Sequence, residues 1–164
     1  MKNIFIKLLS ICYKLFFKAY LKDKENYYRK TFNLHPTSWI GEIEHTVFQG
    51  NISLGANSYF NSGRIVTGRN SKVIIGEWCA IGYNVNMLAL THDVNESTGP
   101  ANKRSQPERD ILIGSNVWIG SNVLIRDGVK IGDNSIIGAN SLVIKDVPER
   151  AIFGGVPAKL IRYK

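Results

Sequence analysis

The sequence predicts an all-β protein: a parallel β-helix of hexapeptide repeats, with one helix before it. Three observations support this prediction. Apolar residues recur every six positions, Gly, Asn and Asp hold fixed places within each period, and the N-terminal segment has a helical pattern. Of the 164 residues, 44% are hydrophobic and 21% are charged, as in a globular chain. This length suits one domain with a short appendage.

Residues 1–30 are predicted to form a basic amphipathic helix. The segment carries a net charge of +6, from eight basic and two acidic residues, out of +8 for the whole chain. On a helix, Lys7, Lys14 and Lys18 fall within about 20° of one direction. Lysines interrupt any signal-peptide core, and no apolar run is long enough to span a membrane. Apolar residues cover much of the other side of the helix: Ile4, Leu8, Ile11, Leu15 and Phe16.

Two roles for this helix remain open. It could lie on the anionic inner face of a membrane, since lysines and large apolar residues occupy different sides. It could instead pack on the base of the β-helix or between subunits, where it would cover open strands.

Residues 31–152 are predicted to form the β-helix. From Ile113 the hexads IGSNVW, IGSNVL, IRDGVK, IGDNSI, IGANSL and VIKDVP follow without a slip, and IGEWCA and IGYNVN precede them in phase. Weaker turns occupy 39–44 and 54–59. Each hexad is a short strand ending in a corner, where Gly, Asn and Asp are expected to supply positive φ. Three hexads per coil make a triangular prism, and six in-phase hexads argue against an ordinary β-sandwich.

The period stops at His92 and resumes after a loop predicted at residues 93–110. The loop is too polar for the core, and long polar insertions in compact repeats are usually functional. The two cysteines, Cys12 and Cys79, lie in unrelated contexts without metal-ligand spacing. We therefore expect reduced thiols, as in a cytoplasmic protein, and no metal site.

Three motifs carry a family resemblance: ALTHDV, SNVWIGSNVLIRDGVKIGDNSIIGANSLVIKDVP and GGVPAKLIR. In this order they resemble the hexapeptide-repeat acyltransferases, whose fold is a left-handed β-helix, and above all the maltose, galactoside and polysaccharide O-acetyltransferases. The resemblance covers residues 39–164. It implies a homotrimer that uses acetyl-CoA as donor, needs no metal and closes each loop over a groove between two subunits.

The resemblance also implies roles for single residues. His92 matches the general base, and an imidazole suits that work because it titrates near neutral pH. A sugar hydroxyl would attack the thioester directly, without an acyl-enzyme. Asn61 and Tyr59 fall near positions that contact the acceptor, and Trp118 flanks the tunnel between donor and acceptor.

On the coenzyme side, the resemblance implies that Ser121 and Ala139 offer backbone contacts to the pantetheine arm. The tail, residues 153–164, would cross the CoA groove after a turn at Gly154 and Gly155. Residues that would flank the adenine or meet the phosphates are Pro157, Ala158, Lys159 and Arg162, with Lys145 as a further cation.

The expected function is O-acetylation of a sugar hydroxyl, on a surface glycan of the O-antigen or capsule type or on its precursor. Two alternatives remain open: N-acetylation of a nucleotide-linked amino sugar, and a non-catalytic β-helix scaffold. Nucleic acid is not an expected partner, because the basic charge sits in an apolar helix without an aromatic stacking platform.

Overall fold

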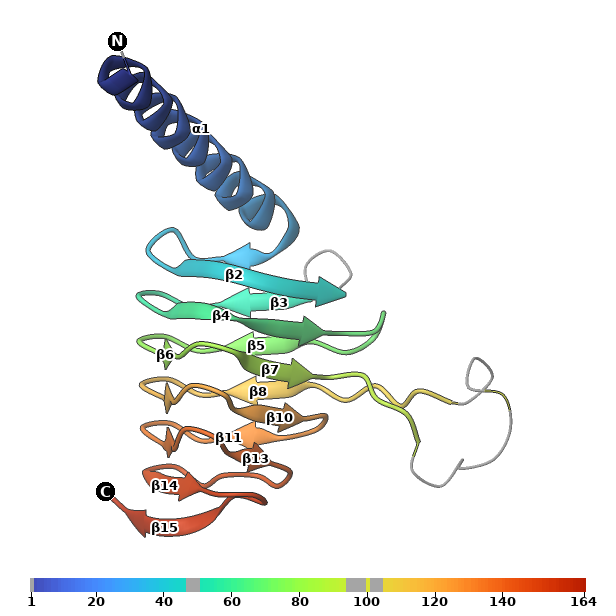
Figure 1. The fold of residues 1–164 in the computed structure, drawn as a ribbon. Helices are drawn as coiled ribbons and strands as arrows, with labels where there is room; N and C mark the ends of the chain where they lie inside the picture. The colour runs from blue at the N-terminus through green and yellow to red at the C-terminus, as the bar shows by residue number, and fades with distance from the viewer. Residues whose placement is uncertain (1, 47–50, 94–99, 101–104) are drawn as a thin grey trace.

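The computed structural model describes residues 2–46, 51–93, 100 and 105–164. An N-terminal helix, α1 (Lys2–Thr31), is followed by a stack of parallel coils. The helix stands at one end of the stack, the C-terminus lies at the other, and a long loop leaves from the side (Figure 1). The predicted β-helix with a preceding helix and an ejected loop is confirmed.

Each coil has three faces, and equivalent strands of successive coils pair in parallel. The first face holds β1 (Asn33–Leu34), β3 (Ile52–Leu54), β5 (Val73–Ile75), β8 (Ile111–Ile113) and β11 (Lys130–Ile131). The second face holds the starts of β2 (Trp39–Thr46) and β4 (Tyr59–Val66), then β6 (Ala80–Ile81), β9 (Trp118–Ile119), β12 (Ile136–Ile137) and β14 (Ala151–Gly154).

The third face holds the ends of β2 and β4, then β7 (Val85–Leu88), β10 (Leu124–Arg126) and β13 (Leu142–Val143). One further strand, β15 (Lys159–Tyr163), turns back and pairs antiparallel with β14. The faces follow one another around each coil, so residues of consecutive coils stack in columns.

The interior is a set of apolar columns. On the second face Ile81, Ile119 and Ile137 stack in register and are fully buried. Each such side chain contributes about 1.5–3 kcal/mol by leaving water. Because every coil repeats the same inward positions, the six-residue period of the sequence is the period of the core.

The corners correct one expectation. Positive φ is supplied by asparagine, with φ between 53° and 60° at Asn57, Asn84, Asn116, Asn122, Asn134 and Asn140. The prediction holds for Gly128, with φ 79°, but was wrong for the glycines that directly follow the first residue of a hexad, which serve close approach instead. A Cβ on Gly132 would lie 2.5 Å from the backbone nitrogen of Glu149 in the next coil. Trp78 adopts φ 58° at a corner where other coils have asparagine.

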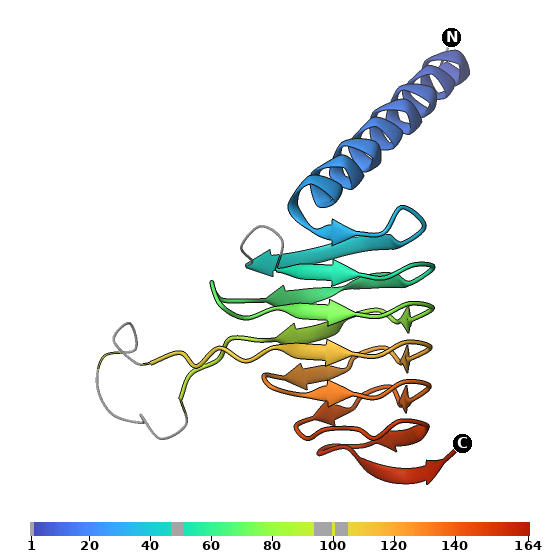
Figure 2. The same cartoon turned by 180° about the vertical axis from the view of Figure 1, so that it is seen from behind.

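Only the last turns of α1 pack on the coils. Tyr28 and Phe32 are buried, and the Tyr28 hydroxyl bonds to the backbone of Ile43, accepting from its nitrogen at 3.3 Å. The rings of Phe32 and His45 meet edge to face at 5.2 Å. The helix thus covers the open end of the first coil, while its earlier turns project away (Figures 1 and 2).

Candidate active site

A groove of about 340 Å³ follows the corner between the second and third faces. Three residues predicted to meet the donor, Trp118, Ser121 and Ala139, line it together. The remaining lining residues are small or inward-facing: Gly82, Ile119, Gly120, Ile136, Ile137 and Gly138.

Backbone forms the floor of this groove. Gly82, Gly120 and Gly138 stack in one column, and each donates its N–H to the next coil at 2.8–2.9 Å. Only the small side chains of Ser121 and Ala139 lie close to these glycines, whereas the Trp118 indole, 57% exposed, lines the groove beside them. An extended chain rich in amides can therefore lie along this corner and pair with backbone groups.

The C-terminal tail lengthens the same edge. Pairing of β15 with β14 sets Arg162 beside Ile152 and Lys159 beside Gly154. Arg162 therefore lies in the same column as Trp118, three strands away through Ile136 and Ile152. At the usual strand spacing, the backbones of Trp118 and Arg162 are about 14 Å apart. Both cations are exposed, so an anionic group at this end of the groove would meet positive charge.

The turn before β15 is fixed to the last coil. Gly155 has φ 99° and donates its N–H to the Ser141 hydroxyl at 3.1 Å, and Ala158 donates to the Leu142 carbonyl at 2.8 Å. Pro157, in the same turn, is exposed. Lys145 lies elsewhere, at the corner between the third and first faces, so a single chain does not place it beside the other cations.

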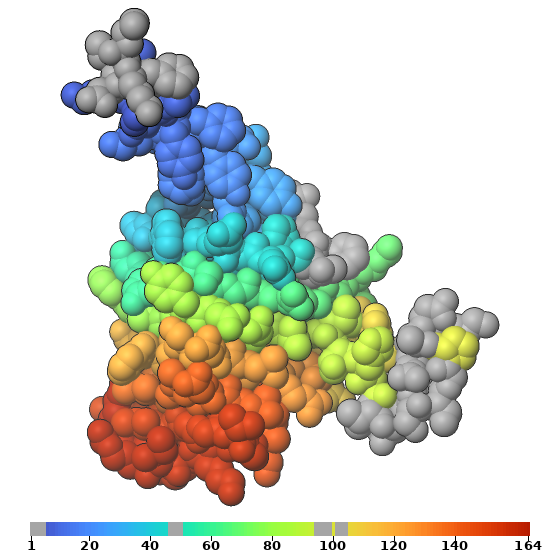
Figure 3. Space-filling model, in the orientation of Figure 1, coloured from blue at the N-terminus to red at the C-terminus, as the bar shows by residue number. Residues whose placement is uncertain are grey.

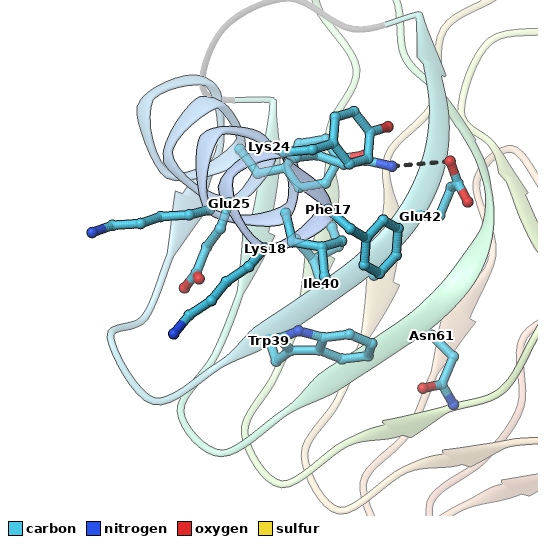
Figure 4. Close-up of a pocket in the computed structure, with 13 residues that line it drawn as sticks. Phe17, Lys18, Lys24, Glu25, Trp39, Ile40, Glu42 and Asn61 are labelled. Atoms are coloured by element: carbon cyan, nitrogen blue, oxygen red, sulfur yellow. Dashed lines mark hydrogen bonds and ion pairs between the residues drawn. The ribbon is translucent and has the colours of Figure 1, made fainter. Parts of the chain in front are cut away.

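The two residues predicted to touch the acceptor lie at the other end of the second face. Tyr59 shares the Trp118 column, with Ala80 between them. Asn61 lines a different and larger pocket, about 640 Å³, between α1 and β2. Figure 4 shows Phe17 and Lys24 reaching from α1 toward Trp39, Asn61 and Glu42 on the strands.

An ion pair spans this second pocket. The Lys24 ammonium lies 3.0 Å from the Glu42 carboxylate. Burial by itself would lower the pKa of Lys24, but the hydrogen bond to Glu42 and the neighbouring Tyr28 and Tyr20 raise it above its usual value. The ammonium therefore stays charged and holds the helix to the first coil.

His92 lies at the foot of the ejected loop. The two limbs of the loop start as an antiparallel ribbon, with a bridge between Leu90 and Glu108 and a bond from the Asp93 N–H to the Ser105 carbonyl at 3.2 Å. The imidazole is exposed and forms no hydrogen bond to any residue that the structure describes. It is thus available to an incoming hydroxyl group.

Carboxylates fasten the returning limb to the coils. Glu108 accepts hydrogen bonds from the backbone of Asn70 and Ser71 at 2.6 and 2.9 Å, and Asp110 accepts from that of Lys72 at 2.8 Å.

An ion pair adds a further tie in the coil below. Arg109 donates to Asp127 at 3.2 Å, and the side chain of this aspartate is only 1% exposed. These contacts fix the direction in which the ribbon leaves the prism.

A single chain does not bring the loop and the groove together. The ribbon leaves at the corner between the third and first faces, whereas the groove follows the opposite edge of the third face (Figures 1 and 2). Strands of two to four residues cross that face in this region, so roughly 10 Å of surface separates them.

Comparisons with known proteins agree with this architecture. A family model described as bacterial transferase hexapeptide (six repeats) matches residues 110–145. A solved galactoside acetyltransferase in complex with coenzyme A superposes with a TM-score of 0.72 at 33% identity, over 87% of this chain and 70% of that chain. This protein belongs to the hexapeptide-repeat acetyltransferase family. The left-handed β-helix implied by the sequence motifs is thereby confirmed.

Curated relatives of this hexapeptide-repeat protein are longer than it is. The sophorolipid acetyltransferase of Starmerella bombicola is 41% identical over 125 residues, which are 76% of this chain and 47% of that protein. The galactoside O-acetyltransferase of Escherichia coli K12 is 35% identical over 126 residues, 76% of this chain and 60% of that protein. The chain spans about half to three-fifths of their length.

Within the described part of this family member, no group of three or more His, Cys, Asp or Glu residues is placed to hold a metal ion. Cys79 is buried beneath a corner, and burial raises the pKa of its thiol above the usual value. It is therefore a core residue, and burial favours the neutral form of its thiol.

Sequence reasoning missed two features of the site. One is the ion pair of Arg109 and Asp127, which nothing in the sequence marks, because other hexads also carry Asp near a corner. Only the register shows that the aspartate of IRDGVK lies beneath the foot of the loop. Trp39 was also missed, although the pairing Trp39–Tyr59–Ala80–Trp118 shows that it begins the aromatic column of the second face.

Proposed function

We propose that this protein is an acetyl-CoA-dependent O-acetyltransferase. Its acceptor is a sugar hydroxyl of a surface glycan or of a glycan precursor, and it works in the cytoplasm, where its donor is available. The observation that carries the proposal is the groove: it is lined by Trp118 and a column of glycines, and Lys159 and Arg162 of β15 extend the same sheet beyond it. The coenzyme has the same order of features, since a thioester and an amide-rich arm lead to an anionic nucleotide.

His92 is the proposed general base. Its imidazole takes the proton of the sugar hydroxyl as the oxygen attacks the thioester carbonyl, and the new C–O bond gives a tetrahedral oxyanion. When this intermediate collapses, the C–S bond breaks and the CoA thiolate leaves. The imidazolium then returns the proton to the thiolate, so the enzyme ends unchanged.

The separation of ribbon and groove within one chain supports a site shared between copies. We propose a homotrimer in which the ribbon of one subunit reaches the groove of the next. In this proposal Tyr59 and Asn61 line the acceptor side, and their position at the far end of the second face from Arg162 supports that role. The relatives with sugar-based names, a galactoside and a sophorolipid acetyltransferase, favour a saccharide acceptor over other alcohols.

The test is thiol release from acetyl-CoA with a panel of sugars, amino sugars and glycan fragments. His92→Ala should lower acceptor-dependent release about 10²–10⁴-fold while leaving CoA binding by calorimetry intact. His35→Ala is the matched control, because this exposed histidine lies at a corner and bonds to Thr37. Full activity in His92→Ala would refute the mechanism, and release only with amino sugars would establish N-transfer instead.

The shared site has its own test. His92→Ala and Gly138→Trp, which fills the groove, are each expected to be inactive alone. Trimers reassembled from a mixture of the two contain some interfaces with an intact ribbon facing an intact groove. Recovery of activity in the mixture is the expected result, whereas no recovery would mean that each chain builds its site alone.

A further inference from the structure

The projecting part of α1 exposes an unusual amount of apolar surface. Every residue from Ile6 to Asp23 is exposed, although Phe17, Tyr20 and Leu21 also line the pocket between α1 and β2. A soluble domain rarely leaves so continuous an apolar surface in water unless something binds it. The large apolar side chains concerned are 46–75% exposed: Ile6, Leu8, Leu9, Ile11, Tyr13, Leu15, Phe16, Phe17, Tyr20 and Leu21.

Most of these side chains fall in two stripes along the helix, whereas Ile11 and Leu21 lie beside the lysines. One apolar stripe follows the helical spacing through Leu8, Cys12, Leu15 and Ala19. A second stripe runs beside it through Leu9, Tyr13, Phe16 and Tyr20. Lys7, Lys14 and Lys18 form a narrow stripe on the remaining side, at the same spacing of seven and then four residues. The helix thus has a wide apolar surface bordered by positive charge.

The positive charge of the helix indicates which kind of partner binds this apolar surface. Residues 2–22 contain five lysines and no acidic residue, the first carboxylate being that of Asp23. If the same helix of a second copy covered the apolar stripes, both sets of lysines would come together without a counter-charge in this segment. An anionic phospholipid surface accepts the apolar stripes and neutralises the lysines at once.

We propose that α1 is a membrane-surface helix that binds anionic phospholipid bilayers. It lies in the interface with the Leu15 and Phe16 stripes among the acyl chains and Lys7, Lys14 and Lys18 at the head groups. The helix is not long and apolar enough to cross the bilayer. Its first turns project away from the coils at one end of the stack (Figure 3), so the bilayer meets the helix without meeting the groove. The inference rests on α1 alone and not on the acetyl-transfer reaction.

The chain offers a natural reporter, because Cys12 lies exposed in the first apolar stripe and Cys79 is buried. An environment-sensitive fluorophore attached to Cys12 of the full chain should shift to the blue on vesicles of phosphatidylcholine with about 30% phosphatidylglycerol. Pure phosphatidylcholine vesicles should give little shift. Sedimentation of the unlabelled protein with the same vesicles measures affinity, and Cys12→Ser verifies that labelling is specific.

The variant Lys7→Gln/Lys14→Gln/Lys18→Gln should bind anionic vesicles on the order of 100-fold more weakly, since each lysine contributes about fivefold. Lys72→Gln/Lys130→Gln/Lys164→Gln removes the same charge from the coils and tail and should bind like the wild type. Leu15→Gln/Phe16→Gln should bind at least about tenfold more weakly. Leu15 and Phe16 are 64% and 75% exposed, so their substitution should leave thermal unfolding unchanged, and that measurement verifies folding of each variant.

Two outcomes would overturn the proposal. One is equal sedimentation of the wild type and the Lys7/Lys14/Lys18 variant with anionic vesicles. The other is a change of oligomeric state in Leu15→Gln/Phe16→Gln, by analytical ultracentrifugation, with no vesicle binding by the wild type. That result would mean that the apolar stripes of α1 form an interface between subunits.

Discussion

Gly120→Ala and Gly138→Ala add the same methyl group at equivalent positions of consecutive coils, and the structure predicts opposite effects on stability. At Gly120 the new Cβ would lie 2.6 Å from the backbone nitrogen of Ala139 and 2.9 Å from its Cα. Neither atom can move without shifting the coil. At Gly138 the nearest atom would be the Phe153 carbonyl oxygen at 3.5 Å, an ordinary contact.

The magnitudes follow from two opposing terms. Forcing a methyl group against backbone costs about 1–3 kcal/mol, whereas replacing glycine by alanine stabilises by about 0.4–1 kcal/mol through the unfolded chain. We expect Gly120→Ala to lose about 1–2 kcal/mol. Gly138→Ala should gain about 0.4–1 kcal/mol, because neither glycine has a positive φ that alanine would resist.

The assay is unfolding in urea or by heat, followed by circular dichroism at one protein concentration, since an oligomer's stability depends on concentration. A difference of about 2 kcal/mol corresponds to roughly 4–8 °C in Tm for a chain of this size. Equal destabilisation of both variants would refute the reasoning, because it would show that the approach of neighbouring coils does not decide which corners need glycine.

Two further predictions concern the buried charge and the thiols. Arg109→Met removes the partner at 3.2 Å from the carboxylate of Asp127 and leaves only Arg126 at 3.5 Å. Since Arg109 itself is 62% exposed, we expect a loss of about 1–2 kcal/mol in urea unfolding. Asp127→Asn in the same background should restore part of it, and no restoration would argue against an electrostatic role. For the thiols, maleimide should modify Cys12 and spare Cys79 in the native protein. Burial raises the Cys79 pKa, so the unfolded chain loses this proton first. The contribution of Cys79 to the free energy of unfolding is complete below the usual thiol pKa and is lost as the pH rises toward the pKa of Cys79 in the folded protein. Cys79→Ala should therefore reduce the loss of stability at alkaline pH, measured by urea unfolding. An equal loss in the variant and the wild type would contradict this prediction.

The sequence alone was sufficient to predict the β-helix. A β-branched residue every sixth position can serve only a coil whose strands repeat with that period, and Ile81, Ile119 and Ile137 do form one column. The corner chemistry was only half predictable. Asparagine and glycine both tolerate positive φ. The sequence pattern does not distinguish a glycine that is required for positive φ from one that is required because the next coil leaves no room for a Cβ.

The candidate site was predicted unevenly. Ser121 and Ala139 hold the same place in hexads of consecutive coils, and Trp118 lies three residues before Ser121, so the period that sets the core also brings these residues to one groove. Asn61 precedes the regular repeats, where the strands of β2 and β4 run on through the corner without a turn, and it lies in the pocket beneath α1 instead.

The sequence by itself determined the coil, the place of the loop, the basic character of α1 and the corner that carries the groove, because all of these depend on local periodicity. The tertiary structure alone decided which residues become neighbours between coils and around corners. Arg109 reaches Asp127 across 18 positions of sequence, and Arg162 joins the column of Trp118 only because β15 turns back on β14. It also separated His92 from the groove by a whole face. The physical reason is that His92, Arg109 and Arg162 lie outside the hexads, so the path of the loop and the turn back of β15 leave no period in the sequence.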